Sequence, residues 1–137
     1  MIRVLVADHE PIISYGIRIL FESSNDIKIV NSVNTKKQLI DYLKKGSIDV
    51  VLLSLDFADS NGMTMIRIIK KEFVTVRVLI YSSHDEDVYA APSVRAGASG
   101  FLLKTSPTNA IKRAILKVFK GGIYLSLIHI SEPTRPS

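Results

Sequence analysis

Short apolar runs alternate with amphipathic helical patterns along most of this chain, and that alternation restricts its fold more than any other feature. The apolar runs are rich in β-branched residues, and they lie at 2–7, 26–33, 49–55, 76–83 and 99–104. The letters VVLL within 49–55 show no polar alternation, which is typical of a strand covered on both faces and hence of a parallel sheet. The sequence therefore predicts five short, mostly buried strands.

Helical patterns occupy the intervals between these strands. The apolar stripes comprise Ile13, Gly16, Ile17 and Leu20; Leu39, Ile40 and Leu43; Met65, Ile66 and Ile69; and Ile111, Ala114, Ile115, Val118 and Phe119. Thr35 and Gln38 have the spacing of a capping box, and Gly46 is expected to end that second helix. Pro92 falls inside the fourth pattern, so a short, kinked or late-starting helix is expected over 85–96.

Five strand–helix repeats predict an α/β fold, namely a (βα)5 flavodoxin-like doubly wound parallel sheet of order 2-1-3-4-5. Right-handed crossovers place the first and third strands side by side. In such sheets the functional crevice lies at the carboxyl ends of the strands. Those ends carry Asp8, His9 and Glu10; Ser54 and Asp56; Ser82 and Ser83; and Lys104. The sequence therefore predicts one polar pocket built from separate stretches of chain.

The bulk properties exclude several classes of protein. With 137 residues and no cysteine, the chain is expected to be one domain without disulfides, thiolate metal sites or cysteine nucleophiles. No apolar stretch is long enough for a membrane span, and the amino terminus does not resemble a secretory signal, so a cytoplasmic protein is expected. The net charge of +5 comes largely from lysine and arginine pairs on the helices, which we interpret as solvated faces rather than a nucleic-acid surface.

Four stretches together resemble the receiver domain of bacterial two-component response regulators. They are VLVADHEPIISYGI, DVVLLSLDFADSNGM, VLIYSSHDED and RAGASGFLLKTSP. The resemblance covers residues 1–124 and is nearest to the branch whose receiver precedes a helix-turn-helix DNA-binding domain. It implies an aspartate after the third strand that accepts a phosphoryl group from a histidine kinase. It also implies two acidic residues that hold Mg²⁺, a hydroxyl after the fourth strand that senses the phosphoryl group, and a lysine after the fifth strand that pairs with it.

The match to the family's functional residues is partial. Asp8 corresponds to the first acidic residue, and the switch residues correspond to Ser82, Phe101 and Lys104. The second acidic position, however, is His9, and the phosphoacceptor position is Ser54.

These two departures remove carboxylates that the family's chemistry needs. A serine cannot form the reactive acyl phosphate, and its hydroxyl needs a base to become nucleophilic. Exchanging a carboxylate for an imidazole weakens a magnesium site, so Mg²⁺ binding is expected to be weak or absent and no cofactor is expected. The resemblance therefore implies a receiver fold that works independently of phosphorylation.

Other readings of the pocket remain open. Asp56 could be a displaced acceptor in a conventional Mg²⁺-dependent switch, although two extended residues move it roughly 6.6 Å from Ser54. Asp8, His9 and Asp56 could bind a transition metal, but adjacent residues on a strand point to opposite faces. His9 or His84 could sense pH. A flavodoxin-like protein that binds FMN is a further alternative, but the loops lack the aromatic and phosphate-cradling residues expected of it.

Structural roles are also expected for the matched residues. Lys104 would pair with Asp8 or Asp56, and Ser82 and Ser83 would accept hydrogen bonds from backbone groups at the strand end. One of Asp59, Ser60 and Asn61 is expected to cap the third helix.

We expect a signalling module rather than an enzyme, acting in transcriptional control through protein contacts. The expected contact surface carries Val88, Phe101, Lys112 and Arg113. The expected partners are a histidine kinase or another signalling protein and possible second copies of the chain, with no membrane contact. Residues 125–137 resemble the translated transposon-end adapter used in preparing sequencing libraries. That tail is expected to be non-native or disordered, which would leave the DNA-binding output domain missing.

Overall fold

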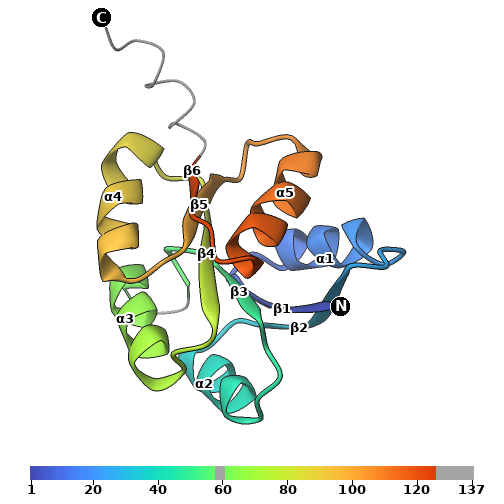
Figure 1. The fold of residues 1–137 in the computed structure, drawn as a ribbon, viewed down its shortest axis with the longest axis horizontal. Coiled ribbons are helices and arrows are strands. Elements are labelled where there is room, and N and C mark those ends of the chain that lie inside the picture. Colours follow the sequence, from blue (N-terminus) through green and yellow to red (C-terminus); the bar gives the residue numbers. More distant parts are fainter. Residues whose placement is uncertain (58–60, 126–137) are drawn as a thin grey trace, which may run out of the picture.

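The computed structural model describes residues 1–57 and 61–125, which form a parallel sheet flanked by helices on both faces (Figure 1). The strands are β1 (Ile2–Ala7), β2 (Ile27–Val33), β3 (Val50–Leu53), β4 (Arg77–Ser82), β5 (Gly100–Leu103) and β6 (Tyr124–Leu125). The helices are α1 (Pro11–Leu20), α2 (Lys36–Lys44), α3 (Gly62–Glu72), α4 (Glu86–Ala96) and α5 (Thr108–Phe119). The strand order is β2-β1-β3-β4-β5-β6, so the predicted order is confirmed and a sixth strand follows β5.

The sheet separates two hydrophobic layers. Successive residues of β3 point to opposite faces, with Val51 and Leu53 in the layer under α2, α3 and α4, and Val50 and Leu52 in the layer under α1 and α5. All four side chains are buried, which confirms the interpretation of the VVLL run as a strand covered on both faces. Every strand pair is parallel, so the carboxyl ends of all strands lie at one edge of the sheet.

Local hydrogen bonds explain where α2 and α3 begin. Thr35 Oγ1 accepts a bond from the backbone N–H of Gln38 at 3.1 Å, as expected of an N-cap. The side chain of Gln38 reaches the N–H of Asn34 at 3.0 Å, one residue before the position that a standard capping box predicts. Asn61 caps α3 by accepting a bond from the N–H of Met63 at 2.8 Å. Gly46 follows the C-cap of α2 with φ of +81°, a conformation that suits glycine.

Helix α4 is neither short nor late in starting, so these two alternatives of the expectation are wrong. It runs for 11 residues with Pro92 inside it and begins directly after Asp85, whose side chain accepts a bond from the N–H of Asp87 at 3.0 Å. The proline deprives the carbonyl of Val88 of its usual helical donor. Because Val88 is 55% exposed, water can solvate that carbonyl and the helix continues.

Two apolar positions expected in the helix stripes face solvent instead. Leu20 and Phe119 are each 40% exposed, and Ile17 is the buried residue of α1. Helix α1 is apolar over most of its surface, since Ile12 and Tyr15 are also exposed and the polar side consists of Ser14 and Arg18, so the spacing of the apolar residues alone does not identify the buried face. Phe119 is the last residue of α5. No helix in the described part of the chain is long and apolar enough to cross a membrane.

Candidate functional site

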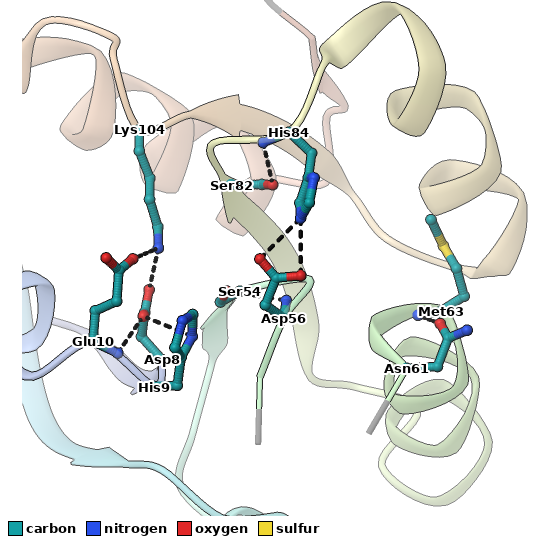
Figure 2. Close-up of polar contacts among 10 residues, drawn as sticks. All are labelled: Asp8, His9, Glu10, Ser54, Asp56, Asn61, Met63, Ser82, His84 and Lys104. Atoms are coloured by element: carbon teal, nitrogen blue, oxygen red, sulfur yellow. Dashed lines mark hydrogen bonds and ion pairs between the residues drawn. The ribbon is translucent and has the colours of Figure 1, made fainter. Parts of the chain in front are cut away.

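The polar side chains expected at the carboxyl edge of the sheet do lie there, where β1, β3, β4 and β5 end. Ala7 pairs with Leu53, and Ser82 pairs with Leu103, so the residues that follow these strands emerge at the same edge. Figure 2 shows the resulting side chains in two groups, one around Lys104 and one around Asp56. These side chains are paired differently from what the family pattern implies.

The first group is an ion-pair cluster around Lys104. Its Nζ lies 3.0 Å from Asp8 Oδ2 and 2.6 Å from Glu10 Oε1 (Figure 2). The side chains of Asp8 and Lys104 are 2% and 10% exposed, and Asp8 Oδ1 also accepts a bond from the N–H of Glu10 at 2.9 Å. The ammonium thus bridges two carboxylates from the loop after β1. Of the two partners expected for Lys104, Asp8 is confirmed.

The cluster shifts the proton affinities of its members. A hydrogen bond from Lys104 and the charge of its ammonium hold the pKa of Glu10 below its usual value. Burial is the largest single influence on Lys104 and lowers its pKa, but the bonds to Glu10 and Asp8 together outweigh burial and raise that pKa. Both shifts favour the charged forms, so the Glu10–Lys104 pair is ionised at neutral pH.

Ser54 is buried at the end of β3 and has a structural hydrogen bond. It is 2% exposed, and its Oγ accepts a bond from the backbone N–H of Asp56 at 3.2 Å. Ser82 makes the equivalent bond at the end of β4, where its Oγ accepts from the N–H of His84 at 2.9 Å. The expected role of Ser82 in binding strand-end backbone is therefore confirmed.

The second group joins Asp56 to His84. The Nε2 atom of His84 lies 2.8 Å from each carboxylate oxygen of Asp56 (Figure 2). The Asp56 side chain is 53% exposed, and the His84 ring also packs against Tyr89 with centroids 5.1 Å apart. Asp56 is thus bonded to the loop after β4, whereas Lys104 is bonded to the loop after β1.

The donor set at this edge does not fit the magnesium ion that the family resemblance implies. Both oxygens of Asp8 are already engaged, one by Lys104 and one by a backbone N–H. Its neighbour His9 presents an imidazole whose Nδ1 is 3.7 Å from Asp8 Oδ1, and Mg²⁺ prefers oxygen ligands. Within 1–57 and 61–125, no three His, Cys, Asp or Glu side chains gather as a metal-binding group. Asp8 and Asp56 therefore lie in separate groups rather than in one metal site.

Three of the four residues expected on the contact surface are exposed. Val88, Lys112 and Arg113 are exposed, but Phe101 is fully buried in β5 and cannot contribute to a surface. It packs in the layer beneath α2, α3 and α4, because residues of a buried strand alternate between two covered faces. Lys112 pairs with Asp26, in the loop before β2, at 3.3 Å.

Two contacts of the site are not predicted by the sequence, namely Glu10 with Lys104 and Asp56 with His84. Glu10 is one of the polar residues expected at this edge, but its bond to Lys104 depends on how the loop after β1 turns. The Asp56–His84 contact joins residues 28 positions apart. The sequence does contain a signal for this contact. Ser54 and Ser82 each stand at the end of a strand, and the residue two positions later is an aspartate in one case and a histidine in the other.

Comparisons with known proteins agree on the family. The model of the response regulator receiver domain matches residues 4–116. The chain is 32% identical over 118 residues to the Fimbriae Z protein of Escherichia coli strain K12, covering 86% of this chain and 56% of that protein. It is 27% identical over 126 residues to the response regulator UvrY of the same strain, covering 92% and 58%. The chain thus spans about half the length of the curated relatives it matches.

Solved structures share the same fold. A two-component response regulator of the LuxR family from Aurantimonas superposes with a TM-score of 0.86 at 24% identity, covering 96% of this chain and 94% of the other. The signal receiver domain of the response regulator NarL from Mycobacterium tuberculosis gives a TM-score of 0.80 at 28% identity, covering 88% and 97%. These likenesses concern the fold, whereas the family model matches most of the chain and the Fimbriae Z protein is 32% identical to it. The chain belongs to the response regulator receiver domain family.

Proposed function

We propose that this chain is a receiver module that signals without phosphoryl transfer to the end of β3. The observation that carries the proposal is Ser54, a buried hydroxyl bonded to the backbone at the position where the family pattern calls for the phosphoacceptor aspartate. A hydroxyl becomes a nucleophile only with a base beside it. Ser54 Oγ accepts a hydrogen bond from a backbone N–H, and such a donor cannot act as a base.

The contacts of Asp56 and Lys104 support the same proposal. Phosphoryl transfer to a carboxylate requires that positive charge neutralise the anionic phosphorus as the carboxylate attacks. Lys104 is held by Asp8 and Glu10, whereas Asp56 is held by His84. Asp56 therefore lacks the ammonium and the metal-binding carboxylates that a displaced acceptor would need.

The module would act through contacts with other proteins rather than as an enzyme. We propose a histidine kinase or another signalling protein as partner, and second copies of this chain as possible partners. DNA would be bound only by an output domain that lies outside residues 1–124. A solved structure of RcsB has two dimers of that protein bound to DNA.

Incubation with acetyl phosphate and Mg²⁺, followed by intact mass measurement, tests the proposal. The expected result is no mass gain for the chain, because neither Ser54 nor Asp56 has the surroundings of an acceptor. A variant that carries both His9→Asp and Ser54→Asp restores the two missing carboxylates and is expected to gain one phosphoryl group. A gain of one phosphoryl group by the unmodified chain that disappears in Asp56→Asn would show a conventional switch instead.

A further inference from the structure

The contact between Asp56 and His84 is built by two copies of the same local turn. Asp56 and His84 each stand two positions after a buried serine. The Oγ of that serine accepts a hydrogen bond from the backbone N–H of Asp56 at 3.2 Å and from that of His84 at 2.9 Å. The serines follow or end neighbouring strands, since Leu53 of β3 pairs with Ile80 of β4. The two turns therefore present the carboxylate and the imidazole to each other, with Nε2 at 2.8 Å from both oxygens (Figure 2).

The contact extends from β3 into helix α4. The His84 ring packs on Tyr89, with centroids 5.1 Å apart and planes inclined by 53°. Asp85, the residue after His84, is the N-cap of the helix. A continuous chain of contacts therefore runs from the loop after β3, through His84, to the second turn of α4.

Helix α4 has little apolar attachment of its own. Its buried residues, in a helix that the structure describes throughout, are Glu86, Ala90 and Ser93, and of these only Ala90 is hydrophobic. The neighbouring α3, by contrast, buries Met65, Ile66 and Ile69. Elements with few buried apolar contacts open at a low free-energy cost. The helix also packs on α3 through Ser93, whose Oγ lies 3.8 Å from Met63 Sδ, and the polar contacts at its amino-terminal end add to what fixes its position.

We propose that Asp56, His84 and Tyr89 form a clasp that holds α4 to the end of β3, and that breaking the Asp56–His84 contact loosens α4 while the sheet stays intact. The clasp rests on the proposed function. In a receiver that carries no phosphoryl group, the clasp is the contact that joins the end of β3 to the loop between β4 and α4. In this arrangement the position of α4 depends on side chains that the chain carries permanently.

Amide hydrogen exchange in Asp56→Ala, His84→Ala and the double variant tests the clasp. Exchange at α4 amides is expected to rise roughly threefold to fivefold in each single variant, the size of effect expected when a partly exposed hydrogen-bonded contact is lost. Amides of β1 and β3 are expected to keep their rates. The double variant is expected to exchange no faster than His84→Ala alone, because His84→Ala already removes the contact with Asp56 as well as the packing on Tyr89.

Lys37→Ala is the matched control. It breaks an ion pair of 2.9 Å with Asp41, which lies within α2 and joins no other element, so exchange at α4 is expected to stay unchanged. Unchanged α4 exchange in both single variants, or effects that simply add in the double variant, would overturn the clasp. The mass measurement is independent of this result: a phosphoryl group on Asp56 would refute the proposed function alone, and unaltered α4 exchange would refute the clasp alone.

Discussion

At the scale of single residues, the site is organised by ion pairing among its own side chains. Lys104 is the cation that the family pattern assigns to a phosphoryl group, yet two carboxylates from the loop after β1 surround its ammonium. Asp8 is buried and Glu10 is half-buried, so the outer of the two bonds is the one open to solvent. Because the Glu10–Lys104 bond is open to solvent, it is the bond of the cluster that a substitution can best test.

The Glu10→Gln substitution is expected to lower stability at neutral pH and to matter less as the pH falls. The pKa of Glu10 is lowered from 4.5 in the folded protein by Lys104. Its contribution to stability is therefore present above that value and is lost as the pH falls through the lower, folded value. Thermal unfolding of both proteins at about pH 7 and about pH 3 measures this, and an equal difference at the two pH values would contradict it.

The sequence places the residues of the site at one edge but does not determine their partners. Asp8, Ser54, Ser82 and Lys104 could be assigned there because parallel strands end together. The turns after those strands could not be predicted, since they depend on which backbone donors each buried serine accepts. For that reason the bond from Lys104 to Glu10 is found only in the structure.

At the scale of secondary-structure elements, α4 is the helix whose sequence is least favourable for a stable helix. Pro92 removes one helical hydrogen bond, and the apolar attachment of the helix is small. The sequence correctly identifies this segment as weak, but it overestimates the consequence, because the affected carbonyl belongs to an exposed residue. The strands are predicted more accurately than the helix faces, since a buried strand needs only an apolar run, whereas α1 is apolar over most of its surface.

The Pro92→Ala substitution is expected to stabilise the protein. Alanine restores the missing backbone donor and has the highest helix propensity, while part of the gain is offset by the greater freedom of the unfolded chain. The net increase in the free energy of unfolding is expected to be about 1–2 kcal/mol, measured by urea denaturation. Ala91→Gly, at the exposed neighbouring position, is expected to change stability in the opposite direction by about 1 kcal/mol. A less stable Pro92→Ala protein would contradict the prediction.

At the scale of the whole molecule, the sheet contains a strand that the five-repeat pattern does not predict. Strand β6 pairs with β5 through Gly100–Tyr124 and Phe101–Leu125, so Leu125 lies in the sheet although the expected tail began there. Two residues are too few to give a pattern in the sequence. The rest of the expected tail, 126–137, and two of the three N-cap candidates, Asp59 and Ser60, lie outside the described residues.

Gly100→Ala is expected to displace β6. A β-carbon at this position would lie 2.8 Å from the carbonyl oxygen of Tyr124 and 2.9 Å from Leu79 Cδ1, closer than such atoms approach. The expected cost is about 1–3 kcal/mol, with faster amide exchange at Tyr124. Gly16→Ala is the control, because no atom lies within 4 Å of its added carbon, and it is expected to be neutral or stabilising. Equal stability of the two variants would contradict this account of Gly100.

The pairing of β6 with β5 also gives the domain a mechanical property. Tyr124 donates its N–H to Ser99 O at 3.0 Å, and Leu125 lies beside Phe101 in the register of the sheet. Separating β6 from β5 requires that this hydrogen bond break, so the bond resists a pull on Leu125. Strand β5 also carries Phe101 and leads to Lys104, so β6 is bonded to the same strand that positions the ammonium.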